Sequence, residues 1–201
     1  MKKIGWILLI IGIAIIGFYT IYIKSLENKA NDNIEDYIKE TSIIEEQEEQ
    51  EIIEPIVEEK VKKKNTINYT AILEIPVISL KSGIVNSTKN FYSINYAISA
   101  DRSSNYPNEY GNFILYAHSG NSSIAYFKHL SNVNIDDSVY VYFNGIKYHY
   151  VIFDKYDIEK TGKAVFKRPI NDNYITLITC NQNRKGYQIV LTGKLINTES
   201  Y

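Results

Sequence analysis

The sequence predicts an all-β fold, a closed or nearly closed barrel of roughly eight short strands. Between residues 67 and 201, short runs of β-branched and aromatic residues recur, and turn residues separate them. The chain has 18 tyrosines and 7 phenylalanines, which supply ample apolar surface for a β-rich core. Little of this region has the periodicity of a helix, so the runs are expected to pair with one another.

The strands are expected in the following order. Residues 71–80 form two short strands separated by Pro76, which cannot donate to a central ladder. Turns are expected at 82–83 and 86–87, an irregular segment at 92–100, and a turn-rich one at 101–112. Further strands are expected at 113–117, 138–143, 146–154, 156–159, 174–180 and 188–195, with one or two helical turns at 124–130.

The strongest local signal is a β-hairpin around Asn144 and Gly145. Alternating apolar residues lie on both sides of this pair. Asn-Gly readily adopts the positive φ angles that a tight type I′ turn requires. The two strands 138–143 and 146–154 are therefore predicted to pair antiparallel.

A long uncharged run opens the chain. Residues 4–23 lack charged side chains, and at about 1.5 Å per helical residue they span the roughly 30 Å core of a bilayer. Lys2 and Lys3 precede the run, which predicts a cytoplasmic N-terminus and an extracellular domain. The run is longer than that of a cleaved signal peptide, and no A-x-A-like site follows it. We predict a single-pass signal anchor over residues 1–24.

Residues 25–66 are predicted to form a charged stalk or linker without chemistry of its own. An acidic stretch at 45–51 and a basic one at 60–64 leave too few bulky apolar groups for an independent core. Pro55 is expected to end any helix near Glu54. A weak helical stripe is formed by Ile34, Ile38, Ile43 and Ile44.

Composition excludes several kinds of site. A formal net charge of −1 gives no overall field that favours nucleic acid. A single cysteine excludes an internal disulfide and a multi-cysteine zinc site, and three scattered histidines do not indicate a metal site. We expect no cofactor. Four acidic residues are candidate calcium ligands, which would allow calcium activation, but their positions in solvated turns explain them equally well: Asp101, Glu109, Asp136 and Asp137.

Two residues at strand ends are candidates for chemistry. Cys180 ends the predicted strand 174–180, and His118 follows the predicted strand 113–117. If these strands are parallel neighbours, both side chains lie at one end of the barrel. A free thiol is only a few per cent thiolate at neutral pH, and an imidazole can take its proton and later protonate a leaving amine. Taken alone, Cys180 is equally well explained as a small buried hydrophobic residue. His118 taken alone is better explained as a strand-end histidine bonded to the backbone.

The chain resembles the sortases, membrane-anchored cysteine transpeptidases of Gram-positive bacteria. The similarity covers the N-terminal anchor and residues 69–196. It is carried by LEIP at 73–76, GNFILYAH at 111–118, FKHL at 127–130, DSVYV at 137–141, TLITC at 176–180 and VLTGKL at 190–195. The resemblance implies the eight-stranded sortase barrel, Cys180 as nucleophile and His118 as acid/base. It also implies that Thr179 lines the substrate groove.

The implied reaction is the transfer of a surface protein. Cys180 would cleave an LPxTG-like C-terminal sorting signal, form an acyl-thioester, and pass the protein to a cell-wall precursor or another amine. Two alternatives remain open: a hydrolytic cysteine protease of the same fold, and a non-catalytic barrel that binds sorting signals. The sequence does not fix the sortase class, the signal or the acceptor.

One position departs from the family pattern. Sortases carry an arginine on the strand after the cysteine loop, where it is expected to stabilise the developing oxyanion. The corresponding position here is Gln188, and the nearest arginine is Arg184. The two positions differ by an even number, so on a continued strand their side chains would point the same way. We predict Arg184 as the third catalytic contact, with Gln188 as the alternative.

Overall fold

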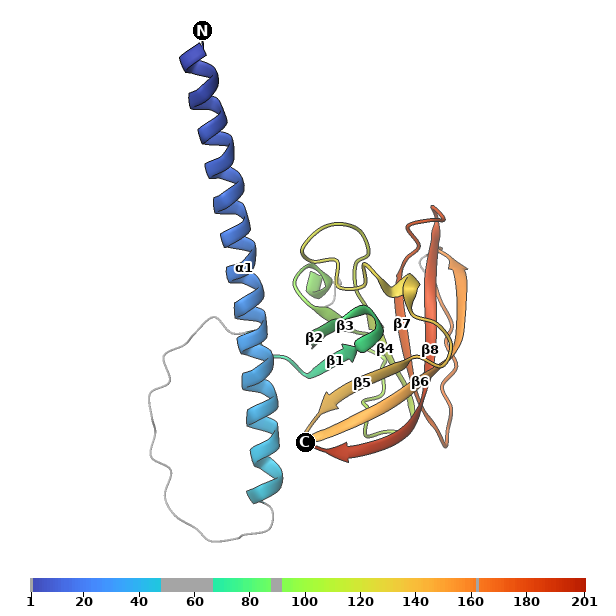
Figure 1. Cartoon of the computed structure of the whole chain (residues 1–201). Coiled ribbons are helices and arrows are strands. Elements are labelled where there is room, and N and C mark those ends of the chain that lie inside the picture. The colour runs from blue at the N-terminus through green and yellow to red at the C-terminus, as the bar shows by residue number, and fades with distance from the viewer. Residues whose placement is uncertain (1, 48–66, 88–91, 162) are drawn as a thin grey trace.

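The computed structural model describes residues 2–47, 67–87, 92–161 and 163–201. One long helix, α1 (Lys2–Gln47), lies beside a β-barrel (Figure 1). The strands are β1 (Ala71–Ile75), β2 (Leu80–Asn86), β3 (Ile98–Ala100), β4 (Gly111–Tyr116), β5 (Ser138–Phe143), β6 (Ile146–Glu159), β7 (Asn173–Cys180) and β8 (Tyr187–Ser200). Three short 3₁₀ helices are Pro76–Ile78, Tyr92–Asn95 and Leu130–Asn132.

The eight strands close into a barrel in the order β1-β2-β3-β4-β7-β8-β6-β5. Most neighbours are antiparallel, whereas β2 with β3 and β4 with β7 are parallel. Inward-facing side chains fill the interior, and the largest of them are fully buried: Tyr150, Phe113 and Phe127. The predicted all-β closed barrel is thus confirmed.

The predicted hairpin is also confirmed. Asn144 and Gly145 have φ angles of 49° and 77°, the positive values of a type I′ turn. β6 is longer than expected and includes the separate short strand predicted at 156–159. It stays continuous because it pairs with β8 along most of its length, through two register shifts.

Two local expectations are wrong. Ser82 and Gly83 lie within β2 and not in a turn. The glycine is needed because the Tyr69 ring covers it, and an added Cβ at position 83 would lie 2.1 Å from that ring. Residues 124–130 form a chain of turns, and the 3₁₀ helix begins only at Leu130.

α1 covers both the predicted anchor and the first part of the predicted stalk. The stretch Ile10–Ser42 contains a window with mean hydropathy 1.5 that is long and apolar enough to cross a membrane, and none of that window is buried. Trp6, just before this stretch, and Phe18 within it are more than 70% exposed, as expected for side chains that face lipid. The helix end predicted near Glu54 lies outside the described residues.

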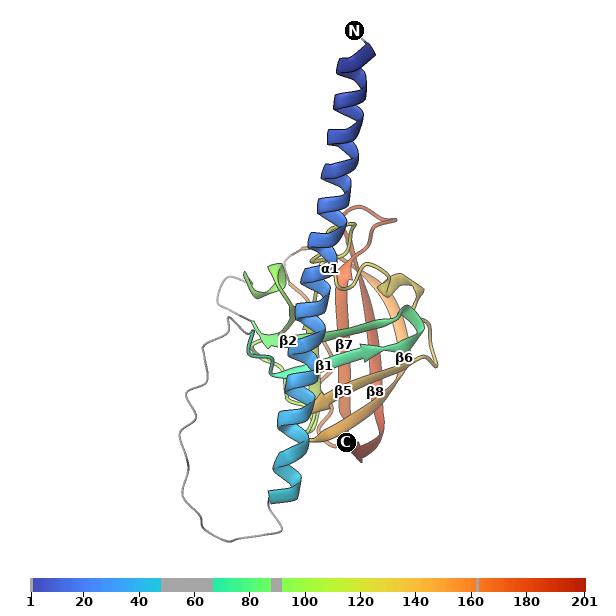
Figure 2. The same cartoon turned by 60° about the vertical axis from the view of Figure 1, so that its left-hand side comes forward.

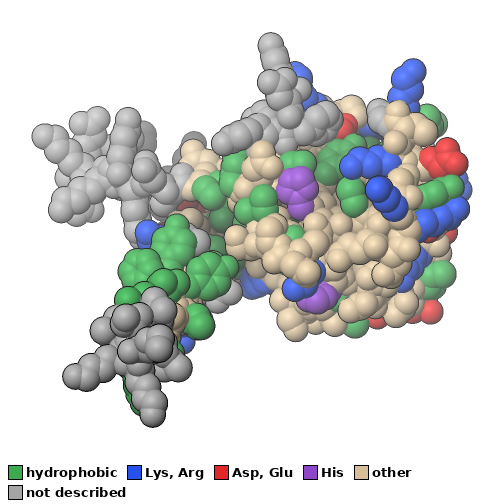
Figure 3. Space-filling view, turned by 90° about the horizontal axis from the view of Figure 1, so that it is seen from above, with side chains coloured by type: hydrophobic (Ala, Val, Ile, Leu, Met, Phe, Trp, Pro, Cys, Tyr) green, Lys and Arg blue, Asp and Glu red, His purple; other side chains and the backbone are tan. Residues whose placement is uncertain are grey.

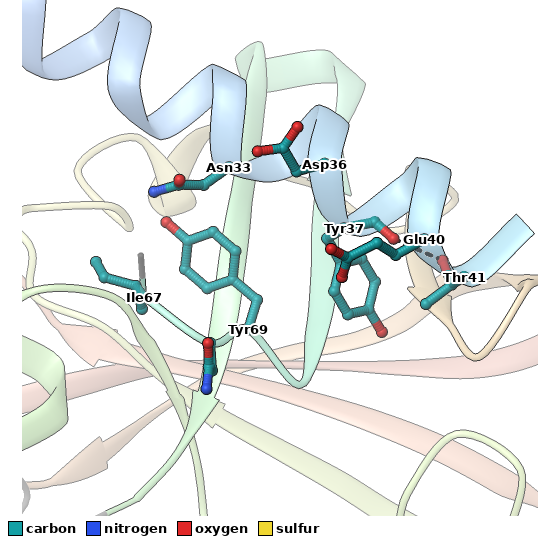
Figure 4. A pocket seen from close by; sticks show the side chains of 8 residues that line it. Asn33, Asp36, Tyr37, Glu40, Thr41, Ile67 and Tyr69 are labelled. Atoms are coloured by element: carbon teal, nitrogen blue, oxygen red, sulfur yellow. Dashed lines mark hydrogen bonds between the residues drawn. The ribbon is translucent and has the colours of Figure 1, made fainter. Parts of the chain in front are cut away.

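The second half of α1 packs along the barrel (Figure 2). Ile34 of the predicted stripe is only 5% exposed, whereas the side chains at 43 and 44 lie outside the described set. The Tyr37 hydroxyl donates to the Thr70 carbonyl at 2.8 Å, and the hydroxyls of Thr41 and Tyr201 are 2.7 Å apart. Figure 4 shows the cavity of about 440 Å³ that α1 shares with residues 67–69.

Candidate active site

The pairing of β4 with β7 brings the two candidate residues to one end of the barrel. These strands are parallel, and Tyr116 lies opposite Ile178. His118 comes two residues after Tyr116, and Cys180 comes two residues after Ile178. The Thr179 hydroxyl donates to the Ala117 carbonyl at 2.8 Å, which ties the two strand ends together. The condition set out from the sequence, that the two strands are parallel neighbours, is thus met.

His118 and Cys180 line the same groove, which has a volume of about 620 Å³. Both side chains are half-buried, so each is reachable from solvent and fixed by its strand. The groove is also lined by Ile94, Asp101, Tyr116, Ala117, Lys160, Lys163, Ala164, Ile178, Thr179 and Gln188. A volume of this size accommodates a short extended peptide.

The imidazole of His118 is held by an amide. Its Nε2 lies 3.2 Å from Oδ1 of Asn95, which belongs to the 3₁₀ helix before β3. This contact fixes the ring at the rim of the groove. Imidazole and thiol share the groove without a direct hydrogen bond in the described residues, and such contacts often tighten only when substrate binds.

A cation that the sequence did not indicate, the ammonium of Lys160, contacts the thiol. Its Nζ lies 3.5 Å from the Sγ of Cys180. Lys160 follows the end of β6, and its backbone N–H donates to the Gly186 carbonyl at 2.8 Å. No local pattern marks this residue, because its position depends on the pairing of β6 with β8 and of β8 with β7.

Gln188 and Arg184 occupy different environments. Gln188 is the direct cross-strand partner of Cys180 and lines the groove. Arg184 lies in the β7–β8 loop, where its guanidinium pairs with Asp157 at 3.7 Å and stacks 3.3 Å above the Tyr187 ring. Arg184 is not among the groove residues. The position of Arg184 therefore gives no support to its predicted catalytic role. The position of Gln188 in the groove supports the alternative.

Asp101 is the acidic residue of the groove. Burial raises the pKa of its carboxyl, but hydrogen bonds from Ser103 and Tyr116 outweigh this effect and leave the pKa below its usual value. Within the described ranges, no three His, Cys, Asp or Glu residues lie close enough together to hold a metal ion. The carboxylate is occupied by hydroxyl and backbone donors of its own neighbourhood.

A mostly β barrel with a cysteine and a histidine at the ends of adjacent parallel strands defines the class of protein. The family model for the sortase domain matches residues 73–196, more than half of the chain. The chain therefore belongs to the sortase family, whose members are cysteine transpeptidases anchored in the membrane. Its one cysteine is Cys180.

Solved structures agree on the fold. Sortase A of Listeria monocytogenes superposes with a TM-score of 0.58 at 22% identity, covering 66% of this chain and 90% of that one. A sortase D5 transpeptidase of Clostridium perfringens gives 0.57 at 20% identity, with 65% and 80% covered. Sortase C1 of Streptococcus agalactiae gives 0.57 at 19%, with 63% and 67% covered. The similar structures thus span several sortase classes, and comparison with curated proteins found no match.

Proposed function

We propose that this chain is a transpeptidase that cleaves an LPxTG-like sorting signal and joins the released carboxyl end to an amine. The observation that carries the proposal is that Cys180 and His118 extend adjacent parallel strands and line one peptide-sized groove. A nucleophile and an acid/base held on rigid strands are what a two-step acyl transfer needs.

In the first step, the Cys180 thiolate attacks the carbonyl carbon of the scissile Thr–Gly bond. A C–S bond forms and the C–N bond breaks, while imidazolium at His118 gives its proton to the leaving amine. Asn95, which contacts the ring nitrogen, positions the imidazole for this transfer. The products are an acyl-thioester that holds the amino-terminal part of the substrate on Cys180, and a released carboxyl-terminal fragment that begins with a free amine.

In the second step, an incoming amine attacks the thioester carbon. His118, now neutral, accepts the proton of that amine; the new C–N bond forms and the C–S bond breaks. The thiolate is restored and the imidazolium is ready for the next cycle. The acceptor is a cell-wall precursor or another amine outside the cell, and the donor is a surface protein with a C-terminal sorting signal.

Lys160 takes the place of the arginine that the family pattern expects. Its ammonium lies beside the sulfur, where it stabilises the thiolate and then the negative charge that develops on the carbonyl oxygen. Gln188, directly across the ladder from Cys180, supplies a neutral amide donor from the adjacent strand β8. Thr179 contributes to the groove wall and anchors the strand that carries the nucleophile.

The apolar start of α1 anchors the protein in the cell membrane as a single-pass span. Lys2 and Lys3 favour a cytoplasmic N-terminus, which puts the barrel outside the cell, where surface proteins and wall precursors meet. The proposed partners are accordingly membrane-attached or extracellular. We propose no cofactor for the reaction.

The test is peptide turnover by the full-length chain in detergent. A library of LPxTG-like peptides is incubated with and without an added amine, and Cys180 is examined by mass spectrometry. We expect an acyl adduct on Cys180 and amine-dependent ligation, both absent from Cys180→Ala. If the peptide is hydrolysed and the added amine never appears in the product, the protein is a protease and not a transpeptidase. Peptide binding without an adduct would replace it with a binding barrel.

A further inference from the structure

α1 runs along the barrel in a defined direction. At the end that carries Cys180, residues Tyr19–Lys24 face the loop after His118 across a cavity of about 400 Å³ lined by Tyr19, Thr20, Ile23, Lys24, Asn121, Ser122 and Ser123. At the opposite end, Thr41 contacts Tyr201, the residue after β8. The 17 steps along the helix from Lys24 to Thr41 rise about 25 Å.

The contact between α1 and the barrel is anchored by polar and apolar groups. Ile34 is buried, and the hydroxyls of Tyr37 and Thr41 bond to groups on the barrel side. Figure 4 shows Asn33, Tyr37 and Thr41 of α1 facing the segment with Ile67 and Tyr69. These contacts oppose rotation of the barrel about the helix, so the orientation of the barrel follows that of α1.

Most of the apolar run lies beyond the Cys180 end of the barrel, and only its last residues, from Tyr19 on, face the loop after His118. From Lys24 back to Ile4 the helix rises about 30 Å, the thickness of a hydrocarbon core. Figures 1 and 2 both show this part of α1 projecting past the end at which β7 ends and β8 begins. When the run spans a bilayer, the Cys180 end of the barrel is the end nearest to the lipid.

The same end of the barrel is rich in positive charge. Figure 3 looks onto it and shows lysine and arginine side chains gathered on one side. Its basic residues are Lys24 on α1, Lys128, Lys160 and Lys163 around the two cavities that Cys180 lines, and Arg184 and Lys185 in the β7–β8 loop. Its acidic residues are fewer: Asp101, Asp157 and Glu159.

We propose that α1 and this basic end together hold the barrel against anionic lipid headgroups, with the Cys180 groove opening at the bilayer surface. The proposal goes beyond the transpeptidase activity and does not depend on it. Surface charges act on an anionic bilayer within about one Debye length, roughly 8 Å at physiological ionic strength. The basic end lies within that reach, and the end near Tyr201, about 25 Å further away, does not.

In this arrangement, substrates attached to the membrane reach the groove more easily than soluble ones. A peptide that leaves the membrane at the end of its own span, or an amine carried on a lipid, meets the groove at headgroup level. A freely soluble peptide must approach between the barrel and the bilayer. The structure thus favours membrane-attached partners over soluble ones through geometry, without any specific contact to their distant parts.

The test places one reporter at each end of the barrel in full-length protein carrying Cys180→Ala. Asn183→Cys lies in the β7–β8 loop and Asn197→Cys lies late in β8, and both positions are exposed. Each is labelled with a fluorophore and reconstituted into phosphatidylglycerol-rich vesicles that contain a headgroup-linked quencher. We expect several-fold stronger quenching at position 183 than at 197. Equal quenching, or stronger quenching at 197, would overturn the proposal.

Two variants separate the contributions of α1 and of charge. Ile34→Asp should shrink the difference between the two reporters, whereas Glu35→Asp, at an exposed neighbouring position, should leave it intact. Lys128→Gln with Lys185→Gln should weaken quenching at 183 in anionic vesicles and not in phosphatidylcholine, with Lys194→Gln at the other end as control. An effect of Lys194→Gln as large as that of the double variant would refute the role of the basic end.

Discussion

Replacing Lys160 tests the least expected feature of the site. Its ammonium is 3.5 Å from the Cys180 sulfur. At that distance, Coulomb's law gives about 5 kcal/mol with an effective dielectric constant near 20, and about 1 kcal/mol in bulk water. Because the Lys160 side chain is exposed, we expect an intermediate value of about 1 to 3 kcal/mol, or about 5- to 150-fold in the rate of acylation.

The assay follows the acyl-thioester on Cys180 by rapid-quench mass spectrometry, with a peptide that the wild-type chain accepts. Lys160→Gln should slow acylation by the factor above with little change in KM, and Lys160→Arg should restore much of the rate because it keeps the charge. Arg184→Gln is the matched control and should stay near the wild-type rate. Acylation at the wild-type rate in Lys160→Gln, or an equal loss in Arg184→Gln, would refute the reasoning.

Three further predictions concern stability and pH, each measured by denaturant unfolding in detergent. Tyr150→Phe should stabilise the barrel by about 1 kcal/mol, because within the described structure the buried Tyr150 hydroxyl has no hydrogen-bond partner; a loss of stability would reveal one. Thr179→Val should cost about 1 to 3 kcal/mol, because it leaves the buried Ala117 carbonyl without its donor, and Thr179→Ser should recover most of this. Burial, and then the charge of Lys147, lower the pKa of His149, so the unfolded chain binds more protons and stability should fall as pH drops below about 6.5. The fall should be smaller in His149→Gln, and an unchanged pH profile would contradict this assignment.

The elements with strong local signals were predictable from sequence. Asn144-Gly145 specifies its own turn. The run that ends at Cys180 is apolar on both faces because the barrel core covers one face and a second cluster of apolar side chains covers the other. Gly83 was misjudged because a glycine signals a turn as readily as it signals a ring packed on the backbone. The candidate membrane span was visible in its length and hydropathy, whereas the continuation of the helix to Gln47 accompanies contacts with the barrel that the sequence does not mark.

The proposed third catalytic contact, Lys160, could not be predicted in the same way. The even spacing of Arg184 and Gln188 favoured Arg184, on the assumption of a continued strand. The chain instead turns before β8 begins at Tyr187, and Arg184 forms an ion pair with Asp157. Lys160 is 20 positions before Cys180 and reaches the sulfur only because β8 brings β6 and β7 to the same end of the barrel. The closeness of Lys160 and Cys180 depends on the strand order of the closed sheet, so the sequence around either residue does not indicate it.

The parallel pairing of β4 with β7 has a consequence for how activity appears during folding. Ala117 and Thr179 are 62 positions apart, and β7 also needs β8 on its other side. Contacts of such long range form late, because the loop that joins them must first be closed. We therefore expect a half-folded barrel to hold its thiol and imidazole far apart, and the proposed activity to begin only when the last strands are in place.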